Sequence, residues 1–443
     1  MSTGSWRNAC RSTRRYTERP YAIRTMMKPR FASTPQSSAK PRVLMVTHVM
    51  PYPPAAGNEI RIYKMLSWFR RKGYAVTLVL KPLGDTEVSN QCILGLRDVV
   101  DELHVFDNRI VLPRPGGTMA KPVQVDTDFA DAELSRIQDG FCPDWFAAEV
   151  APIVAAVRPD VVIAQYVFMS RILELPECGD ALKIIDAHDL FCRKQKTVEQ
   201  YGIKNYSLSL TEAQESALLR RADIVLAIQK AEQDELRQLV PEVEALLTSF
   251  DLDIHHGDPA AVVPDHVLIV ASSNEFNVKG TQDFLDYTWP LVRAARPGAR
   301  LRVIGKVCQF VHCDDPTVSL LGFVESLEAE YEQAAVVVNP CRVGTGLKIK
   351  TIEALAWGKA HVAWPSAADG LRELGDVPAV IVHDAVAFAR EIVALLAREP
   401  ERVALQQAAH AFIEQHFGSE SVYSALTGRI DACRNHDIEQ VPA

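Results

Sequence analysis

Short apolar runs alternate with helical patterns along most of this chain. Residues 43–47 (VLMVT) have the length of a buried strand, residues 58–73 carry apolar side chains at helical spacing, and residues 74–80 (YAVTLVL) form the next run. A strand, a helix and a strand joined by short connections make a βαβ unit, and its two strands pair in parallel. The folded part of the chain is therefore predicted to begin as an α/β unit with a parallel sheet.

The alternation forms two series, which predicts two domains. The first series continues through residues 160–166, 183–187 and 222–228, and the pattern lapses at about residues 240–265. The length of 443 residues also suits two domains of ordinary size. The second series of apolar runs lies at residues 266–272, 299–305, 334–340, 360–364 and 379–382, and helical patterns follow from roughly 384 to 435.

We predict an α/β fold of two tandem Rossmann-like domains, whose mainly parallel sheets face each other across a cleft. Ligands of such sheets bind beyond the carboxyl ends of the strands, so both domains are expected to contact one ligand. The predicted divisions are a disordered basic leader over residues 1–40, a first domain over 41–240, a linker over 241–265, a second domain over 266–415, and a C-terminal helix and tail over 416–443 that return to the first domain.

The first 40 residues differ in composition from the rest. They hold nine Lys or Arg residues and one acid, Glu18, and they are rich in Ser and Thr. One interpretation is an organelle transit peptide. The other is a disordered leader, or sequence upstream of a start at Met26 or Met27, which the lack of a clear apolar stripe favours. In either case this segment is left out of the fold prediction.

Charge and cysteine content limit the class of partner and compartment. Residues 41–443 hold 39 basic and 55 acidic side chains, so nucleic acid is not an expected partner. The nine cysteines are odd in number and irregularly spaced, which favours a reducing compartment and a cytoplasmic location. The helix at 58–73 mixes Arg61 and other basic residues with Trp68 and Phe69. This composition fits peripheral membrane contact, and it fits packing of the helix on the sheet equally well.

The stretch 344–359 (GTGLKIKTIEALAWGK) follows an apolar run and opens a helix. Gly344 and Gly346 allow the backbone to approach a ligand closely. Free N–H groups at the start of a helix from about Leu347 favour an anion, and Lys348 and Lys350 add positive charge. The alternative is an ordinary junction between a loop and a helix, with the glycines forming the turn.

Four other places in the sequence have features of a functional site. Glu353 lies on a mostly apolar helix, and its carboxylate can accept two hydrogen bonds from the vicinal hydroxyls of a ribose. His188 and Asp189 follow a predicted strand, where side chains of an active site belong, although His188 alone is as easily a core histidine. Gly57 opens the first helix, and Lys279 lies just after the first strand of the second domain. Cys308, His312 and Cys313 lack a recognisable fourth ligand, so no metal is predicted.

The chain resembles glycosyltransferases of the GT-B fold, most closely the retaining "group 1", family 4 enzymes that use nucleotide sugars. The resemblance runs from about Arg42 to beyond Leu371. It includes VLMVTHVMPYPPAAGNEIRIYKML, KIIDAHDLFCRK, LLRRADIVLAIQKAEQDEL, and above all LLGFVESLEAEYEQAAVVVNPCRVGTGLKIKTIEALAWGKAHVAW. It implies that the second domain binds the donor nucleotide and that the first domain binds the acceptor.

Roles follow from the resemblance for the positions that match the family motifs. Glu353 matches the glutamate that holds the ribose, and His188 matches a histidine that contacts the transferred sugar. The remaining matches are with groups that surround the diphosphate or the donor sugar: Gly57, Lys279, the backbone of Gly344, Thr345, Gly346 and Leu347 with nearby Lys348 and Lys350, and the loop Asp369, Gly370 and Leu371.

The chain departs from the family pattern at three places. Thr345 stands where many members carry a second glutamate, which contacts the donor sugar. No arginine precedes Lys279, so positive charge for the diphosphate is expected from Lys279, Lys348 or Lys350. Asn58 stands where the family has a second glycine in the first loop.

The resemblance implies a retaining transferase that moves a sugar from a nucleoside diphosphate to an acceptor hydroxyl, without a metal or other cofactor. The acceptor is expected to be a glycan, a lipid-linked compound or a small molecule. A sugar-nucleotide-binding pseudoenzyme and an epimerase or phosphorylase of the same fold are the alternatives. A nicotinamide-dependent oxidoreductase is disfavoured because the chain lacks GxGxxG after its first strand.

Overall fold

The computed structural model describes residues 40–54, 56–83, 86, 88–106, 134, 140–193, 210–324, 326–342 and 347–439. The expected leader lies outside the described residues, apart from Lys40. Gly344, Thr345 and Gly346 of the expected diphosphate site lie outside them as well.

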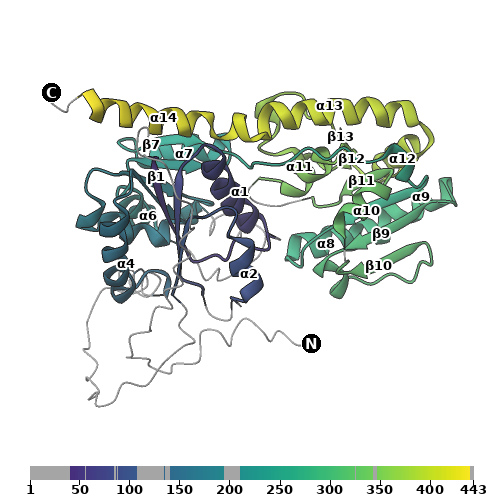
Figure 1. Ribbon diagram of the computed structural model, residues 1–443. Coiled ribbons are helices and arrows are strands. Elements are labelled where there is room, and N and C mark those ends of the chain that lie inside the picture. The colour runs from purple at the N-terminus through teal and green to yellow at the C-terminus, as the bar shows by residue number, and fades with distance from the viewer. Residues whose placement is uncertain are drawn as a thin grey trace, which may run out of the picture.

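The first domain is built on a seven-stranded sheet in the order β3-β2-β1-β4-β5-β6-β7, and every neighbouring pair is parallel (Figure 1). Its strands are β1 (Arg42–Thr47), β2 (Ala75–Leu80), β3 (Glu102–Val105), β4 (Val161–Gln165), β5 (Leu182–Asp186), β6 (Ile224–Ala227) and β7 (Glu244–Leu247). Its helices are α1 (Gly57–Arg71), α2 (Asn90–Gly95), α4 (Asp144–Val157), α6 (Glu212–Leu219) and α7 (Lys230–Leu239).

The second domain has a six-stranded sheet in the order β10-β9-β8-β11-β12-β13, also parallel throughout. The fold class predicted from the alternation, two domains with parallel sheets, is confirmed. The strands are β8 (His266–Val270), β9 (Arg300–Ile304), β10 (Val318–Gly322), β11 (Val336–Asn339), β12 (Ala360–Ala363) and β13 (Val380–Ile381), and the helices are α8 (Glu275–Asp283), α9 (Trp289–Ala295), α10 (Leu327–Gln333), α11 (Ile349–Ala356), α12 (Ala385–Ala397) and α13 (Glu399–Phe417).

The segment expected to be a linker begins with a strand. β7 lies within residues 241–265 and pairs with β6 at the edge of the first sheet. Only Ala245 of its four residues is buried, so β7 has no continuous apolar run. The extended segment between the two sheets therefore starts at Thr248 rather than at residue 241.

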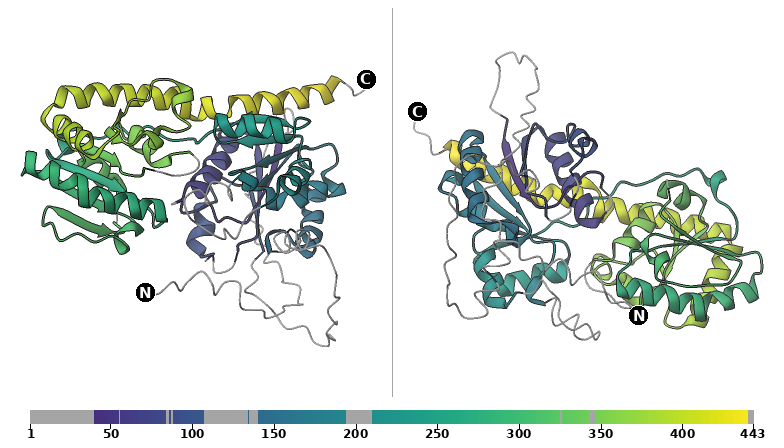
Figure 2. Two further views of the ribbon diagram at one scale, coloured as in Figure 1. Left: turned by 180° about the vertical axis from the view of Figure 1, so that it is seen from behind. Right: turned by 90° about the horizontal axis from the view of Figure 1, so that it is seen from below.

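The chain crosses between the domains twice. It passes first through residues 248–265 and returns where α13 is followed by α14 (Ser419–Glu439). Figure 1 shows α13 along the second domain and α14 along the first, almost end to end, and the view from behind in Figure 2 shows the same arrangement. The two crossings contact each other, because Ser419 Oγ lies 2.8 Å from both carboxylate oxygens of Asp251 and the Leu252 N–H donates to the Phe417 carbonyl at 2.9 Å.

α14 completes the core of the first domain. Tyr423 packs on Trp68 of α1 with ring centroids 5.2 Å apart, and Leu426 and Ile430 belong to the same buried cluster. Trp68 and Phe69 are therefore buried, as packing of the helix at 58–73 within the protein requires. Among the described helices, none is both long enough and apolar enough to cross a bilayer.

Candidate active site

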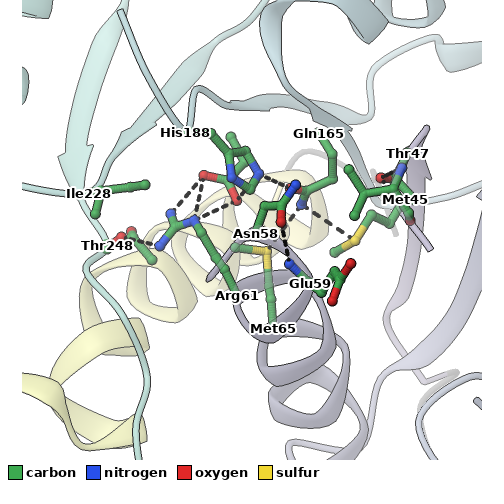
Figure 3. A network of polar contacts seen from close by, with 12 residues as sticks. Met45, Thr47, Asn58, Glu59, Arg61, Met65, Gln165, His188, Ile228 and Thr248 are labelled. Atoms are coloured by element: carbon green, nitrogen blue, oxygen red, sulfur yellow. Dashed lines mark hydrogen bonds and ion pairs between the residues drawn. The ribbon is translucent and has the colours of Figure 1, made fainter. Parts of the chain in front are cut away.

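His188 lies two residues beyond β5, at the carboxyl end of the first sheet (Figure 3). Its Nε2 is 2.7 Å from Oε1 of Gln165, the last residue of β4, and its ring stacks on Tyr166 at 4.0 Å between centroids. His188 and Tyr166 both have positive φ, at 61° and 66°. Residues other than glycine rarely adopt a positive φ, because it strains the backbone. Strain of this kind is concentrated at functional sites, where the surrounding structure maintains it.

A buried ion pair lies beneath His188. The Arg61 guanidinium on α1 donates to Asp186 through Nη2 at 2.7 Å and through Nε at 2.9 Å, and both side chains are inaccessible to solvent. Arg61 Nη1 also donates to the backbone carbonyls of Thr248 and Ser249, at 2.7 and 2.8 Å. Figure 3 shows Arg61 between His188 and Thr248. The guanidinium thus joins α1, the end of β5 and the start of the interdomain segment.

Sequence reasoning missed this pair because it grouped Arg61 with the other basic residues of its helix. The useful signal was its spacing, since Arg61 shares a helical stripe with Met65 and Phe69, which are both buried. An arginine on an apolar stripe needs a buried acid, and Asp186 ends a buried strand.

His188 is neutral near pH 7. Its burial lowers its pKa to about 4, and the opposing effect of Asp186, whose Oδ2 lies 3.5 Å from Nε2, is smaller. The ring therefore acts through hydrogen bonds and orientation rather than through a formal charge. One of these hydrogen bonds is already fixed by Gln165.

In the second domain, two lysines lie beside the loop that follows β11. Lys350 Nζ is 3.1 Å from Oδ1 of Asn277 on α8, and Cys341 Sγ is 2.9 Å from the same oxygen. Burial lowers the pKa of Lys348 and of Lys350, while the negative charge of Asp369 raises that of Lys348. The start of α11 and the loop at residues 369–371 thus form one cluster of charged side chains, which contains Lys348, Lys350 and Asp369.

Gly280 explains how α8 reaches this loop. A Cβ at Gly280 would lie 2.8 Å from the Pro340 carbonyl oxygen and 2.9 Å from Cys341 Cα. Glycine is therefore required for α8 to pack directly on the backbone after β11.

Glu353 is half-buried on α11, three residues after Lys350. Desolvation raises its pKa to about 7, and the charge of Lys350 opposes this shift. Glu353 also raises the pKa of Tyr331, whose buried hydroxyl has no hydrogen-bond partner among the described residues. A desolvated carboxyl group near a lysine is a typical feature of a ligand site.

α11 begins at Ile349, two residues later than expected. Its first amides are partly used within the turn, since the Ile349 N–H donates to Leu347 and those of Thr351 and Ile352 donate to Lys348. In the described part of the chain, the positive charge at this helix start therefore comes mainly from Lys348 and Lys350.

The start of α11 also meets the first domain. A Cβ at Gly57 would lie 2.5 Å from Ile349 Cδ1, and a Cβ at Gly370 would lie 2.6 Å from Gln229 Oε1 and 3.4 Å from Leu347 Cδ1. Gly57, Leu347 and Gly370 are thus close to the junction of the two domains.

Two predicted residues lie apart from this group. The Lys279 side chain is 77% exposed, and its Nζ pairs with Asp283 one turn further along α8 at 3.0 Å. Leu371 is fully buried in the apolar cluster that contains Ile352 and Leu355. A role for Leu371 is thereby restricted to its backbone and to the shape of its loop.

Comparison with known structures supports the architecture. Sucrose-phosphate synthase from Thermosynechococcus elongatus has a TM-score of 0.58 at 16% identity, over 90% of this chain and 100% of that chain. HepE from Anabaena, in complex with UDP and glucose, has a TM-score of 0.58 at 13% identity, over 88% and 99%. A putative UDP-N-acetylglucosamine 2-epimerase from Listeria monocytogenes has a TM-score of 0.53 at 13% identity, over 91% and 98%.

At such low identities the TM-scores show a shared fold alone. A sequence comparison indicates the class of protein. Residues 264–398 match the family model described as "Glycosyl transferases group 1", while a comparison with curated proteins gave no match. Because the architecture and the family match agree, the resemblance to GT-B glycosyltransferases is confirmed, and in sequence it is carried by residues 264–398 of the second domain.

Proposed function

We propose that this protein is a retaining glycosyltransferase that moves a sugar from a nucleoside diphosphate to an acceptor hydroxyl. The observation that carries the proposal is the gathering of Lys348, Lys350 and Glu353 on the first turns of α11, next to Gly57 of the first domain. Lysines suit a diphosphate, and a carboxylate suits the two hydroxyls of a ribose.

The chemistry requires stabilisation of two developing charges. As the bond from the anomeric carbon to the diphosphate breaks, negative charge develops on the leaving group, and Lys348 and Lys350 stabilise it. His188 orients the sugar through hydrogen bonds from its fixed, neutral ring. The acceptor oxygen forms the new bond, and its proton passes to the departing diphosphate on the same face, as the family resemblance implies. No separate general base is assigned.

The proposal is tested by nucleotide binding. UDP is the first nucleotide to try, because the similar HepE structure contains UDP and glucose. Glu353→Ala should weaken UDP binding about tenfold or more in titration calorimetry, because at least one charged hydrogen bond is lost. Glu401→Ala is the matched control, since Glu401 lies on α13 in an exposed pair with Arg398. An unchanged affinity in Glu353→Ala would remove Glu353 from the nucleotide site.

Turnover separates transfer from the alternatives. A transferase releases UDP from UDP-sugar faster when a suitable acceptor is present. An epimerase is the alternative because the similar Listeria structure carries that description. An epimerase changes the sugar without needing an acceptor. A binding protein without activity would retain UDP affinity and convert no donor.

A further inference from the structure

Four residues form a row across the carboxyl end of the first sheet. Lys81 follows β2, His48 follows β1, Tyr166 follows β4, and His188 lies two residues beyond β5. Thr47 pairs with Leu80 in the sheet, so His48 and Lys81 are neighbours across two adjacent strands. The His48 and Tyr166 rings are 4.9 Å apart, and the Tyr166 and His188 rings are 4.0 Å apart.

Lys81 is a buried cation without an acidic partner in the described part of the chain. Only 2% of the Lys81 residue is exposed to solvent, and its Nζ donates to the Gly140 carbonyl oxygen at 2.9 Å. An ammonium group has three donors, so two remain after this contact. Desolvation lowers its pKa to about 8, with no carboxylate among the groups that oppose the shift. A buried charge without a countercharge is costly, which indicates that an anion compensates it in a bound state.

His48 provides a second unsatisfied group beside this lysine. Its ring is half-buried, and its Nδ1 is buried with no hydrogen-bond partner in the described structure. Burial lowers the pKa of His48 to about 3, with a smaller contribution from the positive charge of Lys81, so the His48 ring is neutral near pH 7 beside that cation. The ring also contacts Phe141 at 4.8 Å between centroids, which limits how far it can turn away.

We propose that Lys81 and His48 bind an anionic group of the acceptor, a phosphate or a carboxylate, and that the acceptor hydroxyl lies toward His188. This rests on the proposed transfer function. Three strand spacings separate Lys81 from His188, about 14 Å, which is enough for a small acceptor with its anionic group at one end and its hydroxyl at the other. The acceptor class is therefore a small phosphorylated or carboxylated hydroxyl compound.

Calorimetry with three probes of one ring type tests the proposal directly. Glucose 6-phosphate, glucuronate and glucose are titrated into the full chain, with and without saturating UDP, so that binding at the donor lysines is excluded. We expect at least one of the two anionic probes to bind about ten times more tightly than glucose, and Lys81→Met to abolish that difference. Lys72→Met is the control, because Lys72 lies in an exposed pair with Glu420.

Folding of the variant is checked separately. Methionine fills similar space without a buried charge, so Lys81→Met should unfold at a temperature no lower than the wild type. The proposal is overturned if neither anionic probe binds more tightly than glucose, or if Lys81→Met binds the anionic probes as tightly as the wild type does. Failure of UDP binding would instead count against the proposed function, since the anionic probes are also measured alone.

Discussion

Burial moves the ionisation of Glu353 and His188 toward the neutral form. It raises the pKa of Glu353 to about 7 and lowers the pKa of His188 to about 4. Near pH 7 the histidine is uncharged and the glutamate is partly protonated. Ribose hydroxyls that donate to Glu353 would favour its ionised form, so nucleotide binding and loss of this proton are expected to be linked.

The Glu353 carboxyl should make stability depend on pH. Its pKa rises from 4.5 to about 7 on folding, so the folded state binds the proton more tightly. The free energy of unfolding therefore falls as pH rises between these two values, by up to about 3 kcal/mol, and this loss levels off above the folded pKa. Glu353→Gln removes this dependence. Thermal unfolding of both proteins at about pH 5 and about pH 8 should show the wild type losing stability relative to the variant; an equal response to pH would contradict the prediction.

Sequence position explains which residues of the site could be predicted. Lys350 and Glu353 are three residues apart on one helix, so their proximity follows from helical geometry alone. Arg61 and Asp186 are separated by 125 residues, and only the parallel sheet brings them together. Lys279 was predicted from its place after β8, yet its side chain pairs along its own helix.

At the scale of elements, the contact between α8 and the loop after β11 depends on the absence of a side chain at Gly280. The neighbouring atoms belong to the backbone of Pro340 and Cys341, which cannot rotate away as a flexible side chain would. The position of this loop relative to Asn277 and Lys350 is therefore set by one glycine.

Gly280→Ala should destabilise the protein. The added methyl group forces α8 and the loop apart, at a cost of about 1–3 kcal/mol that exceeds the gain in helix propensity. Gly428→Ala is the control, because Gly428 lies within α14 and a Cβ there meets nothing within 4 Å. The control should be more stable than the wild type by about 0.5–1 kcal/mol. Urea unfolding of both variants measures the two effects, and a stabilised Gly280→Ala would show that the packing is looser than described.

Three of the four edge strands were not revealed by sequence periodicity. Central strands are covered on both faces and read as continuous apolar runs, whereas β7 and β10 are partly exposed. β3 contains buried His104, whose Nε2 lies 2.9 Å from Glu102. All three lie at an edge of their sheets, whereas the fourth edge strand, β13, lies within the predicted run at residues 379–382.

At the scale of the whole molecule, α14 joins the end of the chain to the first domain. Its Tyr423 is fully buried against Trp68, and the tyrosine hydroxyl has no hydrogen-bond partner in the described structure. Stability of the first domain therefore depends on a helix that follows the second domain in sequence.

Two substitutions at Tyr423 separate packing from polarity. Tyr423→Ala leaves a large cavity beneath α14 and should destabilise the protein by about 3–5 kcal/mol. Tyr423→Phe keeps the ring and removes an unpaired buried hydroxyl, so its stability should equal or exceed that of the wild type. Thermal unfolding distinguishes them; similar losses in both variants would mean that the hydroxyl, rather than the ring, matters.

The packing of α14 on α1 also sets the order in which the chain can mature. The first domain leaves the ribosome well before the second, and domains generally fold as they emerge. Here Val422, Tyr423, Leu426 and Ile430 belong to the core of that first domain. Its final assembly must therefore wait until translation of the second domain is finished, and until then the Trp68 ring of α1 lacks its contact with Tyr423.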